Sequence, residues 1–152
     1  MRAIAAIEGE LDSFPEGLDA PAAAGWLLAL AEEVLEGWIT DRGEVPTPDR
    51  REGFRLLALH RQGAINTPSF NACRETCREI AYHYNLLVQD PLDARSAQRQ
   101  RMMGMLVRHL ALFVGGKQQA EALGDFCCAS RPLRQESATI AEDAMKGATE
   151  NA

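Results

Sequence analysis

Two cysteines, Cys73 and Cys77, lie four residues apart in the segment NACRETCREIAYHYN. At this spacing both side chains lie on one face of a helix, where two thiolates could share a metal ion such as zinc. Structural zinc sites usually use Cys-x2-Cys pairs instead, and a disulfide between the two positions would distort the helix. A metal or redox site at these cysteines is therefore the weaker alternative, and we expect no cofactor.

The apolar residues around the cysteines recur at intervals of three and four, which is the period of one buried helical face. Free cysteine is among the most buried residue types and packs as a small hydrophobic side chain. We therefore interpret both cysteines as core residues with free thiols. The complete apolar stripe is Phe70, Cys73, Cys77, Ile80, Tyr84 and Leu87.

Glu79 and His83 are the catalytic candidates, because a carboxylate one helical turn before a histidine could orient the imidazole for acid–base chemistry. A side-chain pair on a helix surface explains the same spacing. The sequence contains none of the motifs G-x-S-x-G, H-E-x-x-H and G-x-G-x-x-G. It leaves enzymatic activity open but favours a protein that is not an enzyme.

Arginines dominate the charged residues of the segment 94–120, which contains no acidic residue. Guanidinium groups form paired hydrogen bonds with phosphates and carboxylates, so a row of arginines could bind an anionic ligand. An anion- or phosphate-binding module is therefore the alternative function. The candidate anion-binding residues are Arg95, Arg99 and Arg101, with Arg74 and Arg78 on the cysteine-bearing helix.

Acidic residues of the helix predicted at 20–41 offer a different explanation for these arginines. Glu32, Glu33 and Glu36 could pair with them inside the chain, and we favour this account. The whole chain has a net charge of -6 and a pI near 5.1. We therefore expect no general nucleic-acid binding.

The segment 102–114 is apolar on nearly all sides, so other helices or another subunit must cover it. Methionine is also common on adaptable binding surfaces. These features predict a protein that acts through protein–protein interaction, as a regulatory, adaptor or assembly factor. We expect an unidentified protein partner and self-association into a homodimer. The interface candidates are Trp26, Trp38, Met102, Met103 and Met105.

Helices are predicted over most of the chain by apolar periodicity and by capping residues followed by proline. No segment alternates as a β-strand does. Short connections favour antiparallel neighbours, so we predict an all-α, single-domain, antiparallel up-and-down helical bundle of five to six helices. The predicted ranges are 20–41, 48–62, 68–88, 91–114 and 117–128, with a weaker helix at 134–147.

We divide the chain into an N-terminal arm with a short helix at 1–18, a helical bundle at 19–130, and a peripheral C-terminal helix with a frayed tail at 131–152. The N-terminus does not resemble a secretory signal. The longest apolar run, 102–114, is too short to span a bilayer and contains Arg108. We therefore expect a cytoplasmic protein that does not enter a membrane.

Overall fold

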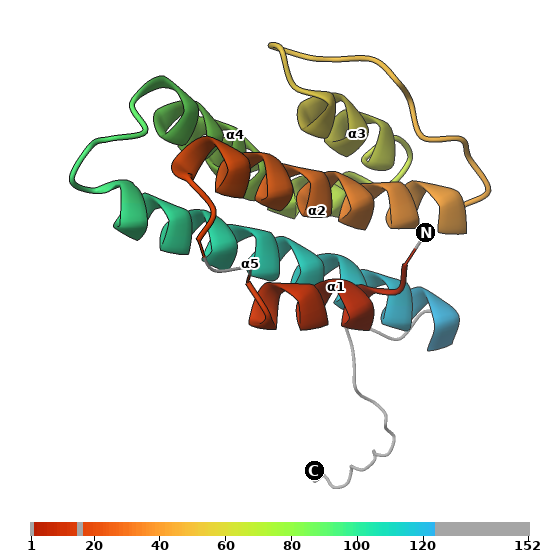
Figure 1. Ribbon diagram of the computed structural model, residues 1–152. Helices are drawn as coiled ribbons and strands as arrows, with labels where there is room; N and C mark the ends of the chain where they lie inside the picture. The colour runs from red at the N-terminus through yellow and green to blue at the C-terminus, as the bar shows by residue number, and fades with distance from the viewer. Residues whose placement is uncertain (1, 15–16, 124–152) are drawn as a thin grey trace, which may run out of the picture. The chain divides into compact units, whose positions relative to one another are not determined.

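The computed structural model describes residues 2–14 and 17–123, and these residues contain helices and no β-strand. The prediction of an all-α helical bundle is confirmed (Figure 1). The helix predicted at 134–147 and the tail predicted from residue 131 lie outside the described residues. In chain order the elements are α1 Ile4–Asp12, α2 Ala20–Asp41, α3 Arg55–Gly63, the 3-10 helix η1 Pro68–Cys73, α4 Arg74–Gln89 and α5 Ser96–Leu123.

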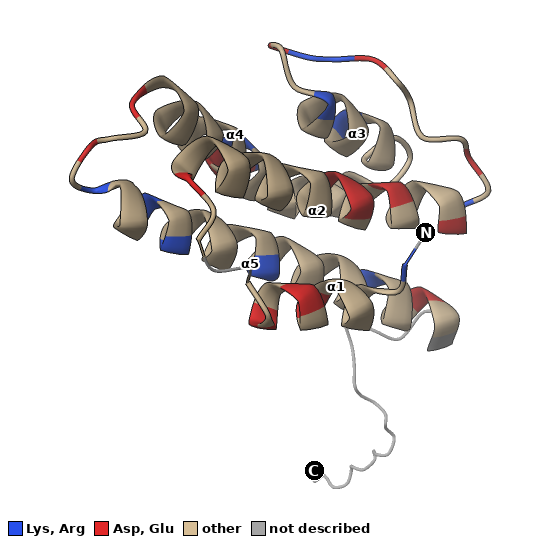
Figure 2. Ribbon diagram, in the orientation of Figure 1, with Lys and Arg blue, Asp and Glu red and all other residues tan. Residues whose placement is uncertain are grey.

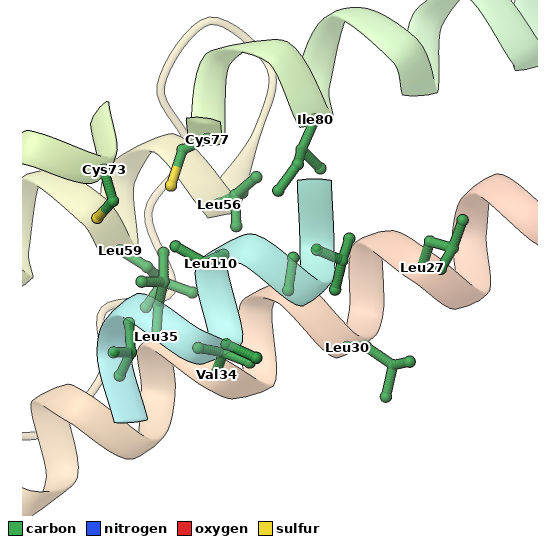
Figure 3. Close-up of a cluster of buried hydrophobic side chains, with 14 of the residues drawn as sticks. Leu27, Leu30, Val34, Leu35, Leu56, Leu59, Cys73, Cys77, Ile80 and Leu110 are labelled. Carbon is green, nitrogen blue, oxygen red and sulfur yellow. The ribbon is translucent and has the colours of Figure 1, made fainter. Parts of the chain in front are cut away.

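The described residues up to Val114 belong to one compact unit, and residues 115–123 are separate from it. The hydrophobic core of the first unit forms around α2, which packs against α1, α3 and α4. Part of this core is drawn in Figure 3, where Cys73 and Cys77 lie on the same side of the cluster as Leu59 of α3 and Leu110 of α5, and Leu27 and Leu30 of α2 lie farther away. No helix among the described residues is both long and apolar enough to cross a membrane.

The beginning of α2 follows the local sequence signals. The Asp19 carboxylate accepts a hydrogen bond from the Ala22 backbone N–H at 2.9 Å, and Pro21 lies in the first helical turn. Capping by a short acidic side chain satisfies a backbone donor that has no partner within the helix, and proline needs no such partner. The capping and proline signals therefore predict this helix end correctly.

The first helix is part of the core, although the sequence suggests a surface arm. Ile7 and Leu11 of α1 are buried. Ion pairs hold the segment at both ends: the Arg2 side chain bonds to Glu33 of α2 at 2.6 Å, and Arg108 of α5 bonds to Asp12 at 2.5 Å. The N-terminal segment thus packs closely against two helices that follow it in the chain.

The helix predicted at 48–62 begins only at Arg55, so that prediction is wrong for its first half. Arg51 and Phe54 exchange two backbone hydrogen bonds, of 2.9 and 3.0 Å, across a tight turn. The two residues between them, Glu52 and Gly53, have positive φ angles of 54° and 85°. A helix cannot pass through two left-handed residues, so this turn delays the start of α3.

The connection before α3 is therefore much longer than predicted and comprises the 13 residues 42–54. It lets the chain return along α2 before the next helix begins. Arg55, at the start of α3, forms an ion pair with Glu36, while Gly63, at its end, accepts a hydrogen bond from Trp38. As Figure 1 also shows, α3 passes α2 in the same chain direction, whereas α4 runs back along α2.

The predicted helix break at Gly115 and Gly116 is also wrong, because α5 continues from Ser96 to Leu123 without interruption. Glycine inside a helix costs only about 1 kcal/mol relative to alanine. The residues that follow, KQQAEAL, are good helix formers and extend α5. The start of α5 lies later than predicted, since the Asp93 carboxylate accepts a hydrogen bond from the Arg95 N–H and stabilises a turn there.

Candidate functional site

The cysteine pair lies inside the hydrophobic core. Cys73 ends η1 and Cys77 lies one turn into α4, and both are buried. The Cys73 thiol donates a hydrogen bond to the Phe70 carbonyl oxygen at 3.3 Å. The Cys77 thiol bonds to the Cys73 sulfur, which lowers the pKa of Cys73 and raises that of Cys77. Among the described residues, no three histidine, cysteine or acidic side chains gather as a metal site.

The proposed catalytic pair does not form. The His83 Nδ1 atom lies 2.9 Å from the backbone oxygen of Glu79, so the imidazole donates to the main chain and not to the carboxylate. The Glu79 side chain is exposed, and His83 is only partly buried. The two residues therefore form a local helix-surface contact, which is the simpler of the two readings of their spacing.

The arginines of α5 and the turn before it do not gather into one anion site. The Arg95 guanidinium donates two hydrogen bonds of 3.0 Å to the Asp93 carboxylate, and these bonds keep the pKa of that carboxyl well below its usual range. Arg99 lies 3.7 Å from the same carboxylate. Arg101 lines a groove between α1 and α5. Two of the three predicted arginines therefore share one aspartate, whose single negative charge offsets only one of them.

The predicted pairing between α2 acids and these arginines is wrong as well. Glu33 pairs with Arg2, and Glu36 pairs with Arg55. Figure 2 shows the reason: the acidic residues of α2 lie toward its C-terminal end, whereas the basic residues of α5 begin at the opposite end of the bundle. Sequence alone could not assign these partners, since side chains from distant segments determine them.

A pocket of about 380 Å³ gathers arginines from three separate segments. It lies where the turn of residues 51–54, the last turns of α3, and the η1–α4 junction meet. We call this site the arginine pocket. Its polar lining consists of Arg51, Arg61, Arg74, Arg78, Asn71 and His60.

Only one of these four arginines has an acidic partner among the described residues. Arg78 forms an ion pair with Glu52 at 3.2 Å. The side chains of Arg51, Arg61 and Arg74 have neither a carboxylate within ion-pair distance nor a side-chain hydrogen bond to any described residue. Three uncompensated guanidinium groups therefore line a single pocket in a chain whose net charge is -6.

The local backbone makes this concentration of charge unfavourable. Arg74 and Arg78 are four residues apart on α4, so their like charges repel one another. Glu52, which neutralises Arg78, has the positive φ angle that non-glycine residues rarely adopt. Such local conflicts are typical of binding sites and not of segments selected for stability.

The floor of the arginine pocket rests on a stack of aromatic rings. His60 is the one buried polar residue of the described core, and its Nε2 lies 3.2 Å from the Phe70 carbonyl oxygen. The His60 ring stacks on the Phe70 ring with their centroids 5.6 Å apart, and the Phe70 ring stacks on Trp38 with a centroid distance of 4.7 Å. The Trp38 indole N–H donates to Gly63 O at 3.0 Å. This stack joins the end of α3 to η1 and so positions the pocket.

Two of the predicted interface residues are unavailable at the surface of the chain, because Trp38 and Met103 are fully buried. Trp26 is partly buried and packs edge-to-face on Phe14, with ring centroids 5.2 Å apart. Met102 and Met105 are exposed, Met105 to 65%. Only these two methionines, and in part Trp26, remain interface candidates.

A second pocket, of about 480 Å³, lies between α1 and α5 and is mainly apolar. We call it the α1–α5 groove. Met105 borders it, and the basic side chains of Arg101 and Arg108 lie at its edge. Its apolar walls come from Leu11, Phe14, Ala97, Gly104 and Met105.

Arg51, Arg61 and His60 were not among the sequence-predicted site residues. One signal pointed to His60, which follows Leu56 by four residues and so shares its buried helical face. Arg51 and Arg61 carry no local signal of this kind, because their approach to Arg74 depends on the tight turn and on the packing of α3.

No known protein family, curated protein or solved structure matches this chain.

Proposed function

We propose that the protein is a binding protein that holds a small anionic ligand in the arginine pocket. The observation that carries this proposal is the meeting of Arg51, Arg61 and Arg74 without acidic partners among the described residues. Guanidinium groups bind phosphate and carboxylate oxygens with paired, charge-assisted hydrogen bonds. A bound anion would offset the repulsion between these groups.

Isothermal titration calorimetry with inorganic phosphate at low ionic strength tests the proposal. Wild-type protein should show saturable binding, and the double variant Arg61→Gln, Arg74→Gln should lose it. Arg101→Gln is the matched control, because Arg101 lies outside the pocket and has no ion pair with any described residue. It should bind phosphate as the wild type does. Phosphate binding that is absent in the wild type, or unchanged in the double variant, would contradict the proposal.

A second proposal is protein–protein interaction through the exposed face of α5, with another copy of this chain as the partner. Met105 and Leu112 are seven residues apart on α5 and are exposed to 65% and 58%. Residues at this spacing share one helical face. Together with the apolar α1–α5 groove they form a surface that a two-fold homodimer would cover.

Cytoplasmic location also stays a prediction, based on the sequence.

Sedimentation equilibrium tests the homodimer. Wild-type protein is expected to be dimeric at micromolar concentration, and Met105→Asp should be monomeric, since a buried unpaired charge disfavours association. Leu92→Asp is the control, because Leu92 is 94% exposed and lies in the loop before α5. This variant should remain dimeric. A wild-type protein that stays monomeric over the same range would rule out the proposal.

A further inference from the structure

The number of uncompensated charges in the arginine pocket indicates what kind of anion it accepts. Arg78 is neutralised by Glu52, which leaves the guanidinium groups of Arg51, Arg61 and Arg74. A single phosphate ester carries roughly -1.5 to -2 charges near neutral pH. Three guanidinium groups therefore exceed the charge of one phosphate, and they match a ligand with two linked phosphate groups better.

The volume of the pocket and the positions of its three arginines also favour a ligand with two phosphate groups. Its volume of about 380 Å³ lies within the range of roughly 300 to 1,000 Å³ that is usual for pockets of small organic ligands. The three arginines come from a turn, from the end of α3 and from the start of α4. Cations on three separate segments can contact different oxygen atoms of an extended anion. A lone phosphate ion would leave most of the pocket empty.

Part of the pocket lining is apolar and can contact an organic group of a ligand. Leu57, Ala64 and Ile65 form this part, and Ile65 is 57% exposed. An apolar side chain beside a cluster of charges gains from contact with an apolar or aromatic part of a ligand. Asn71 adds an amide that can both donate and accept hydrogen bonds. The lining thus combines an anion site with a place for a neutral organic moiety.

A long polyanion fits the site less well than a small molecule does. The three arginines are confined to one pocket, and the whole chain has a net charge of -6. Nucleic acids need an extended basic surface, because each phosphate along the strand must be neutralised in turn. The arginines of one pocket do not form such a surface, so a small anion fits the site better than a nucleic acid does.

From these observations we infer that the ligand of the arginine pocket is an organic diphosphate, such as a nucleoside diphosphate. The two phosphate groups lie among Arg51, Arg61 and Arg74, and the organic moiety lies against Ile65 and Asn71. This inference rests on the proposed function, since it requires that the arginine pocket bind an anion at all. It goes further by naming the class of that anion.

Calorimetric titration of the full chain with four probes tests this inference: ADP, AMP, inorganic pyrophosphate and inorganic phosphate, all without divalent metal ions. ADP should bind at least about 10-fold more tightly than AMP, because a further charge-assisted contact is worth about this factor. ADP should also bind several-fold more tightly than pyrophosphate. Arg51→Gln should reduce the preference for ADP over AMP, and Arg101→Gln should leave it unchanged.

Ile65→Ser separates the organic part of the ligand from its phosphates. It should weaken ADP binding several-fold and leave pyrophosphate binding as in the wild type, because pyrophosphate has no organic group that could contact Ile65. Equal affinities for ADP and AMP, or for ADP and pyrophosphate, would overturn the diphosphate inference and leave anion binding intact. Absence of inorganic phosphate binding by the wild-type protein would overturn the proposed function itself.

Discussion

Replacement of Arg74 by glutamine is expected to weaken phosphate binding by about 10- to 100-fold, since a hydrogen bond to a charged group contributes roughly 1.5–3 kcal/mol. The same substitution should not destabilise the ligand-free protein. Arg74 is the first residue of α4 and has no acidic partner among the described residues. Removing one of two like charges that lie four residues apart on α4 should raise the free energy of unfolding by about 0.2–0.5 kcal/mol.

Urea denaturation and calorimetry on the same preparations measure the two effects. For an arginine that binds the ligand, the substitution weakens phosphate binding and raises the free energy of unfolding. For an arginine with a structural role, it lowers the free energy of unfolding. Arg78→Gln provides a contrast, because Arg78 has the carboxylate of Glu52 as a partner. Its loss should lower stability slightly and affect binding less than the loss of Arg74. If Arg74→Gln lowers the free energy of unfolding by more than ~1 kcal/mol, Arg74 has a structural role and the argument from electrostatic conflict is wrong.

Gly63→Ala is expected to lower the free energy of unfolding by about 1–3 kcal/mol, because the added methyl group has no space. A Cβ atom at position 63 would lie 2.9 Å from Trp38 Cδ1 and 3.0 Å from Phe70 Cε2. Both rings are fully buried and stacked on one another, so neither can move aside at low cost. The substitution should also disturb the hydrogen bond from Trp38 to Gly63 O.

The matched control for this prediction is Gly25→Ala, which makes the same chemical change in the exposed middle of α2. Apart from the adjacent residues and the backbone of the helix itself, no atom lies within 4 Å of a Cβ placed there. Alanine loses less conformational entropy than glycine on folding, so this variant should be more stable by about 0.5–1 kcal/mol. Urea denaturation should therefore shift the two variants in opposite directions. A shift of both in the same direction would show that Gly63 is not closely packed.

The sequence by itself determined the features that depend on neighbours along the chain. Apolar spacings of three and four residues predicted the helical fold and the burial of Cys73 and Cys77, which lie in the core. Asp19 and Pro21 predicted where α2 begins. These signals are local, because a helical face and a helix cap are formed by residues within a few positions of one another.

Other local signals were outweighed by structure that a single segment does not reveal. Gly115 and Gly116 resemble a helix end, yet α5 continues through them, since two glycines cost less than ending a helix whose next residues favour it. The tight turn at Glu52 and Gly53 delays α3 and lengthens the connection before it. That turn is held by backbone bonds and by the contact of Glu52 with Arg78 on α4.

The arginine pocket was decided by the tertiary structure alone. Arg74 was a candidate from the sequence, but the residues that accompany it, Arg51 and Arg61, are distant in the chain. Whether an arginine is neutralised depends on which acids lie within a few ångströms of its guanidinium group. Asp93 occupies Arg95 and Arg99, whereas no acid among the described residues reaches the three pocket arginines. Hydrophobic period reports which face of a helix is buried, but long charged side chains find their partners only after the helices have packed.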